Sequence, residues 1–219
     1  MVHPDDDKTC DKSKIIEISV SHFRFKYRLR WLSRIFYCRG FGVQSPSAYR
    51  FIRYVINEHY PYYAYDDLRK EFPETSLIDE KIYRLYFRVA NFMQPCRFIN
   101  YGKPAEILSR YVNAGCRCTE IINIEEMSDA SYGYLTDGTA PLLLRVNLYE
   151  GAYDRPLSLI DNMAENAIMM VDGIKHNRRT RNIWRQLRDD TRTGVTFDLY
   201  YCGIVFFDKR IKQNYIVNF

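Results

Sequence analysis

The spacing of apolar residues changes near the middle of the chain, and this change limits the folds that the chain can adopt. Before residue 95, apolar residues recur at helical spacing within 29–36, 46–56 and 82–92. After residue 96, short apolar runs alternate with polar segments that are long enough for a helix. This alternation predicts a parallel sheet with helical crossovers. The expected parallel strands are 97–100, 119–124, 142–146 and 167–171.

Three closely spaced apolar runs end the chain, at 195–200, 204–207 and 215–219. The segments between them are too short for helices, so these runs are expected to pair antiparallel. The sequence therefore predicts an α/β fold with a mainly parallel sheet and a C-terminal antiparallel hairpin. Residues 1–95 are expected to form an N-terminal helical extension, and residues 96–219 the sheet domain. The predicted sheet core consists of Phe98, Ile99, Ile122, Ile124, Leu143, Met169, Val171, Val205 and Phe207.

Basic residues are concentrated near the N-terminus. The whole chain of 219 residues has 32 Lys and Arg against 27 Asp and Glu, but residues 18–57 contain no acid at all. Basic side chains interleaved with aromatic ones are typical of surfaces that bind nucleic acid or anionic membranes. An ordinary surface helix, whose arginine stems cover apolar area, explains the same pattern. The bases are Arg24, Lys26, Arg28, Arg30, Arg34, Arg39, Arg50 and Arg53.

Several functional classes have no support in the sequence. The longest apolar runs are far shorter than the roughly 18 residues of a membrane-spanning helix, and the acidic N-terminus is unlike a signal peptide. A cytoplasmic location is therefore expected. Of six cysteines, only Cys116 and Cys118 are closely spaced, which favours reduced thiols over a metal site. The sequence has no phosphate-binding loop, zinc-protease motif or serine-hydrolase triad order.

Three separated segments resemble, in the same order, segments of a known protein group. They are Arg-Gly-Phe-Gly-Val-Gln-Ser-Pro at 39–46, Tyr-Tyr-Ala-Tyr-Asp-Asp at 62–67, and Thr-Phe-Asp-Leu at 196–199 with Gly-Ile-Val-Phe-Phe at 203–207. The group consists of bacterial proteins similar to class I S-adenosylmethionine-dependent methyltransferases. The resemblance implies a Rossmann-like sheet, S-adenosylmethionine as cofactor, and a small-molecule or protein methyl acceptor. Phe41 and Gln44 stand where the group has histidines.

The cofactor motif of this group is degenerate here. The group has an acid-x-Gly-x-Gly-x-Gly turn after the first strand, whereas this chain reads Asn-Tyr-Gly-Lys-Pro-Ala at 100–105. Asn100 replaces the acid, only Gly102 remains of the glycines, and Pro104 stiffens the loop. Glu125 follows the second strand, 23 residues after Gly102, near the separation of about 20 residues seen in nucleotide-binding units. Asn100, Gly102 and Glu125 are therefore the candidate cofactor-binding residues, although Glu125 also fits a solvated loop acid.

Asp172 and His176 follow the fourth expected strand and are the candidate catalytic residues. Ligands of α/β sheets bind at the carboxyl ends of strands, and a neutral histidine can accept a proton from an acceptor group. His176 also fits an ordinary loop histidine in a basic run. Two functions remain open. One is a methyltransferase of unknown acceptor with weakened or lost cofactor binding. The other is a non-catalytic protein of the same fold that binds an anionic partner through its basic N-terminal helices.

Overall fold

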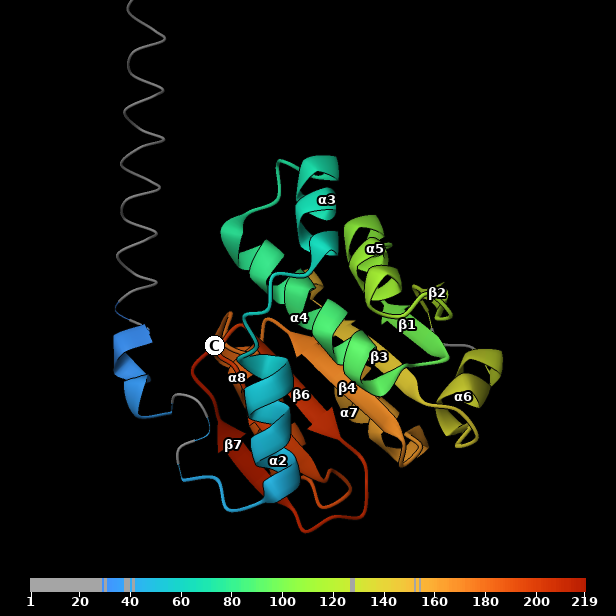
Figure 1. Ribbon diagram of the computed structural model, residues 1–219. Helices are drawn as coiled ribbons and strands as arrows, with labels where there is room; N and C mark the ends of the chain where they lie inside the picture. Colours follow the sequence, from blue (N-terminus) through green and yellow to red (C-terminus); the bar gives the residue numbers. More distant parts are fainter. Residues whose placement is uncertain are drawn as a thin grey trace, which may run out of the picture.

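A seven-stranded sheet forms the centre of the computed structural model, which describes residues 29, 31–37, 40, 42–126, 129–151, 153 and 155–219 (Figure 1). The order of the strands across the sheet is β2-β1-β3-β4-β6-β5-β7. The strands are β1 (Arg97–Tyr101), β2 (Glu120–Ile124), β3 (Leu142–Asn147), β4 (Ala167–Asp172), β5 (Val195–Asp198), β6 (Cys202–Phe206) and β7 (Gln213–Ile216).

The strand directions confirm the predicted fold class. Strands β2, β1, β3 and β4 pair parallel, and β6 pairs antiparallel with both β4 and β5. The expectation that all three C-terminal runs pair antiparallel is wrong for the last one, because β7 pairs parallel with β5. The reason is that β6 already has a neighbour on each side. The last strand can pair only with the free edge of β5, and it starts at the same end of the sheet as β5 does.

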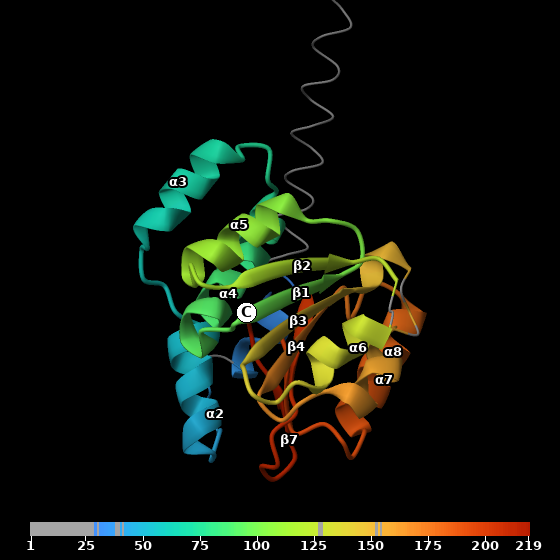
Figure 2. The same cartoon turned by 90° about the vertical axis from the view of Figure 1, so that its right-hand side faces the viewer.

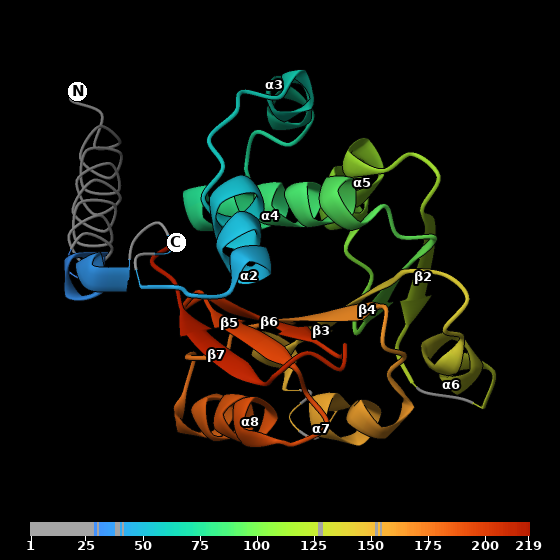
Figure 3. The same ribbon diagram turned by 60° about the horizontal axis from the view of Figure 1, so that its bottom comes forward.

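Helices cover both faces of the sheet, as Figure 3 shows. On one face lie α2 (Pro46–Phe51), continued by the π-helical turn η2 (Ile52–Ile56), and α4 (Leu77–Met93) with α5 (Glu106–Gly115). The other face carries α7 (Arg155–Leu159) and α8 (Arg178–Asp189). Helix α3 (Tyr63–Glu71) lies outside α4 and α5 (Figure 2), and α6 (Asp129–Thr136) lies near the β2 edge. Short 3-10 turns are η1 (Ile35–Tyr37), η3 (Leu148–Glu150) and η4 (Ile160–Asn162).

Local sequence signals fix the ends of the two helices that matter most for the site. Ser45 caps α2 by accepting a hydrogen bond from the backbone of Ala48, and Pro46 occupies the first turn. Ser76 caps α4 in the same way, and Gln94 ends this helix in the left-handed conformation. Helix α4 thereby runs from the carboxyl edge of the sheet back to the start of β1.

The core has one apolar layer on each face of the sheet. Eight of the nine predicted core residues are buried, and Ile122 is half-buried because β2 is an edge strand. Phe51, Ile52 and Val55 belong to the same cluster as Phe98 and Leu143, so the helices before β1 pack directly on the sheet. On the opposite face, a Cβ atom at Gly203 would lie 2.3 Å from the Trp184 ring, which explains the glycine in β6.

The basic N-terminal segment is only partly within the described residues. Arg24, Lys26, Arg28, Arg30 and Arg39 lie outside them, as does Phe41. Arg50 and Arg53 are exposed, whereas Arg34 is buried and has a structural role. Within the described ranges, no helix is both long and apolar enough to cross a membrane.

Arg34 and Lys175 hold Asp198 at the end of β5. The Nη2 atom of Arg34 donates to the backbone oxygen of Asp198 at 2.6 Å and to its Oδ1 at 3.0 Å. Lys175 Nζ lies 2.7 Å from Asp198 Oδ2, and the backbone N–H of Tyr200 donates to Oδ1. Burial alone would raise the pKa of Asp198, but the hydrogen bond from Lys175 and the two positive charges lower it below its ordinary value.

We expect Asp198→Asn to lower the free energy of unfolding by about 1–3 kcal/mol at neutral pH. Because the folded pKa of Asp198 is lowered, its contribution is present above the unfolded pKa of about 4 and is lost as the pH falls through the folded value. Urea unfolding of the parent and the variant from neutral to acidic pH tests this. The stability difference should shrink on acidification, and a pH-independent difference would contradict the ionic role.

Candidate functional site

The carboxyl ends of four parallel strands bring the predicted site residues to one edge of the sheet. In the strand register, Tyr101 lies beside Ile124 on one side and Val146 on the other, and Asn147 lies beside Asp172. Asn100 and Gly102 are therefore at the end of β1, Glu125 directly follows β2, and Asp172 ends β4. His176 follows in the loop before α8.

Arg145, in β3, lies at the centre of this edge and joins two of the predicted residues. Its Nε donates to Asp172 Oδ2 at 2.7 Å, and its Nη1 donates to Asn100 Oδ1 at 2.8 Å. The hydroxyl of Tyr86, from α4, donates to the other Asp172 oxygen at 3.2 Å. All four residues are buried. We call Asn100, Arg145, Asp172 and Tyr86 the central polar cluster.

Every polar atom of the Asn100 side chain is already engaged in a hydrogen bond within the protein. Its Nδ2 donates to the backbone oxygen of Lys103 at 2.8 Å and to Asn123 Oδ1 at 2.9 Å. Together with the bond from Arg145, both amide hydrogens and the carbonyl oxygen are used. The side chain therefore fastens the turn after β1 to the neighbouring strands.

Burial shifts the pKa values of the groups in the central polar cluster. Burial raises the pKa of Asp172, and the adjacent Arg145 charge opposes that rise. It also raises the pKa of Tyr86 well above its ordinary value, and the Asp172 charge adds to this shift. Burial is the largest influence on Arg145 and would lower its pKa, but the charge and hydrogen bond of Asp172, together with Tyr86 and Glu150, raise that pKa. The Asp172 carboxylate is hydrogen-bonded to Arg145 and Tyr86, so it is not free to take a proton from a methyl-accepting substrate.

The Gly102 turn lies beneath the side chain of Glu150. Gly102 has φ +142°, and its N–H donates to the Ile124 oxygen at 2.9 Å, which joins the turn to the end of β2. A Cβ atom at Gly102 would lie 2.8 Å from Glu150 Oε2. The same oxygen accepts the backbone N–H of Lys103 at 3.0 Å, and Glu150 Oε1 accepts from Asn147 Nδ2 at 2.7 Å. The Glu150 carboxylate thus already accepts the hydrogen bond that the Lys103 backbone N–H of this turn can donate.

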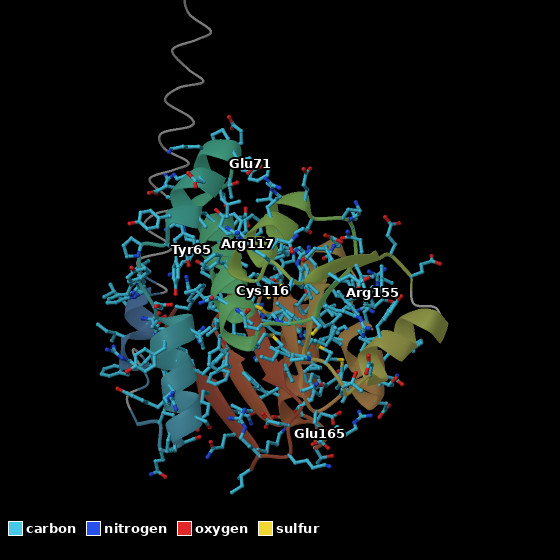
Figure 4. All side chains as sticks on the ribbon, turned by 45° about the vertical axis from the view of Figure 1, so that its right-hand side comes forward. Tyr65, Glu71, Cys116, Arg117, Arg155 and Glu165 are labelled. Atoms are coloured by element: carbon cyan, nitrogen blue, oxygen red, sulfur yellow. The ribbon has the colours of Figure 1, made fainter. Side chains whose placement is uncertain are left out.

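Arg155 covers the other side of the turn. Its guanidinium carbon lies 4.3 Å from the centre of the Tyr101 ring, and its Nη2 donates to the backbone oxygen of Glu125 at 3.0 Å. Figure 4 shows Arg155 at the β2 end of the molecule. Glu125 itself is exposed, as is the adjacent Glu126, so two carboxylates remain open to solvent here.

His176 is the one predicted catalytic residue that is accessible to solvent. Its ring packs edge-on against Tyr149, with 4.9 Å between the ring centres. Its backbone N–H donates to the oxygen of Gly173, which holds the loop in a tight turn. The structure therefore separates the two candidate catalytic residues: Asp172 is inside the central polar cluster and His176 is at its outer rim.

Three important residues of this edge were not predicted from the sequence: Arg145, Glu150 and Tyr86. Arg145 had a usable signal, because a charged residue inside the apolar run 142–146 needs a buried partner. The roles of Tyr86 and Glu150 have no comparable signal. Cys116 and Cys118 are free thiols, and among the residues described no group of three or more His, Cys, Asp or Glu could hold a metal ion.

The order and directions of the strands define the fold as a Rossmann-like sheet, mainly parallel with antiparallel C-terminal strands. No protein-family model matches the chain, and no curated protein does. Solved structures with a similar arrangement include cofactor-bound Rv0187 from MTB, with 9% identity, a TM-score of 0.45, and coverage of 66% of this chain and 86% of that one.

Two further solved structures resemble the chain. One is the O-methyltransferase TomG from Streptomyces achromogenes in complex with SAM, with 12% identity, a TM-score of 0.43, and coverage of 68% of this chain and 91% of that one. The other is the SAH-bound methyltransferase PaMTH1 from Podospora anserina, with 13% identity, a TM-score of 0.44, and coverage of 95% and 99%.

Proposed function

We propose that this protein is an S-adenosylmethionine-dependent methyltransferase with low affinity for its cofactor. The observation that carries the proposal is the turn at the end of β1. Gly102 is hydrogen-bonded to the last residue of β2, so the glycine and the exposed Glu125 lie next to each other at the carboxyl edge. This is the position at which α/β folds bind nucleotides.

The residues at this edge fit the cofactor in part. S-adenosylmethionine carries a ribose diol, and the exposed Glu125 supplies a carboxylate for it beside the Gly102 turn. Asn100 does not fit the role of the acid found in related proteins, because its amide carries no charge and is held by three hydrogen bonds within the protein. Glu125 would hold the ribose, and the backbone of the turn would hold the amino-acid end once Glu150 moves away from the Lys103 amide.

The chemistry needs few protein groups. When bound, S-adenosylmethionine supplies a methyl group that its sulfonium already activates, so alignment accounts for most of the rate. His176 is exposed at the rim and is the group that would take the proton from an acceptor hydroxyl or amine. Asp172 has a different role in this proposal, since it positions Arg145 and thereby Asn100 and the turn. The acceptor is a small molecule or a protein.

Calorimetric titration with S-adenosylmethionine tests the proposal. We expect weak, saturable binding to the parent and an at least tenfold loss in Glu125→Ala, since a hydrogen bond to a charged group is worth about 1.5–3 kcal/mol. Glu126→Ala is the matched control, because Glu126 is an equally exposed neighbour, and it should bind like the parent. Equal affinities of the parent and Glu125→Ala would place the cofactor elsewhere.

A second function is favoured by one observation, namely that Arg145 occupies both Asn100 and Asp172. Polar groups that hydrogen-bond to one another stabilise the sheet edge without a ligand, as expected for a non-catalytic protein of the same fold. Such a protein would bind an anionic partner, for example nucleic acid, through its basic N-terminal segment, of which Arg50 and Arg53 are exposed on the described surface. No heat with S-adenosylmethionine, together with salt-sensitive retention on heparin, would favour this alternative.

A further inference from the structure

A cavity of about 390 Å³ lies on the helical face that carries α4, apart from the central polar cluster. Its walls come from residues 56–61, Tyr65, three residues of α4, Trp31 and residues 218–219. Figure 4 shows Tyr65, which lines the cavity, on the side of the molecule opposite to Arg155. None of the candidate site residues discussed above lines it.

The α4 wall of the cavity is cationic. Lys81, Arg84 and Arg88 are spaced three and four residues apart, so they share one face of the helix. Arg88 donates to the backbone oxygens of Val55 at 2.6 Å and Ile56 at 3.2 Å. The hydrogen bonds of its guanidinium that the described residues show go to neutral acceptors, and the carboxylate of Glu58 lines the same cavity.

Two donors at the cavity have no acceptor. Arg84 is bound to Glu80 through Nη2 at 2.5 Å and lies over the Tyr65 ring, but its Nε is buried without a partner. The Nδ2 atom of Asn57 is also buried without a hydrogen-bond partner. A buried donor without an acceptor costs about 1–3 kcal/mol, so folded proteins rarely leave two beside one cavity. A small rotation of either side chain toward the cavity would let a ligand oxygen accept its hydrogen.

The remaining walls combine aromatic rings with polar side chains, among them the carboxylate of Glu58 as well as His59 and Asn218. Trp31, Tyr60 and Phe219 line the cavity, and Lys81 Nζ lies 4.5 Å from the centre of the Phe219 ring. Planar apolar groups pack well against such side chains. A bare inorganic anion would use only the cationic wall, and a neutral aromatic molecule only the aromatic one.

We propose that this cavity binds a small aromatic oxyanion. Its negative group is directed at Arg84 and Asn57, and its ring lies between Trp31 and Tyr60. The cavity volume is within the ordinary range for small-molecule sites, about 300–1,000 Å³. This inference is independent of cofactor binding, because the two sites share no residue.

Phenyl phosphate is a suitable probe, with phenol as the matched neutral ring and inorganic phosphate as the matched bare anion. We expect phenyl phosphate to quench tryptophan fluorescence saturably in the full chain. The signal belongs to Trp31, because the other tryptophan, Trp184, is buried on the opposite face of the sheet. Phenol and phosphate should each bind at least about tenfold more weakly, since phenol lacks the anionic group and inorganic phosphate lacks the aromatic ring.

Arg84→Gln should weaken phenyl phosphate binding at least about tenfold. Arg69→Gln is the matched control, because Arg69 also pairs with Glu80, at 3.7 Å, but does not line the cavity. Thermal unfolding of both variants shows whether they are folded, and Lys81→Met replaces Arg84→Gln if the latter is not. Absence of saturable binding by the parent, or equal weakening in Arg69→Gln and the cavity variant, would overturn the proposal.

Discussion

Replacing Arg145 by leucine is expected to lower the free energy of unfolding by about 3–5 kcal/mol, the cost of breaking a buried ion pair by removing one partner. The variant leaves the Asp172 carboxylate buried without its cation and removes a donor from Asn100. Burial already raises the pKa of Asp172, and without Arg145 that pKa rises further. Since a raised carboxyl pKa favours the protonated folded state, the variant should regain stability as the pH falls. Urea unfolding at several pH values measures both effects.

Two further variants make this result specific. Arg110→Gln removes a guanidinium from an exposed pair with Glu71 and should change the stability by less than about 1 kcal/mol. Arg145→Leu combined with Asp172→Leu removes both charges and should recover most of the loss. A loss below about 1 kcal/mol in Arg145→Leu itself would show that the central polar cluster does not hold the edge of the sheet together.

The sheet could be predicted from the sequence because apolar spacing reports directly on burial. Most residues in β1, β3 and β4 are buried, so these strands read as mainly apolar runs, interrupted by Asn100 in β1 and Arg145 in β3. The pairing of β7 could not be predicted in this way. It depends on which strand still has a free edge, and linker length carries no information on that point.

The position of the candidate residues in the fold was predictable, and their surroundings were less so. The carboxyl ends of parallel strands meet at one edge, so Asn100, Glu125 and Asp172 could be placed there from the sequence alone. Whether Asn100 and Asp172 are open to a ligand depends on a third strand, because Arg145 reaches both from between them. Glu150 reaches the turn after β1 from the end of β3, and no local pattern marks such a long-range contact.

Glu150 is expected to limit cofactor binding, so Glu150→Ala should increase the affinity for S-adenosylmethionine by about tenfold to a hundredfold. Its carboxylate accepts the Lys103 N–H and lies over Gly102. A ligand carboxylate at this turn must therefore compete with a carboxylate that is tethered to the protein. Removing Glu150 frees the amide and clears the space above the glycine, and the change in affinity is measured by calorimetry.

Glu150→Gln is the matched control for this competition. The amide oxygen of glutamine can still accept the Lys103 N–H, so this variant should bind the cofactor about as weakly as the parent. A loss of affinity in both variants would contradict this prediction, because it would mean that the negative charge of Glu150 attracts the positively charged cofactor. If both variants lose binding, Glu150 contributes its negative charge to the cofactor and replaces the acid that Asn100 lacks. In that case the contact between Glu150 and Lys103 orients a binding residue and does not block the turn.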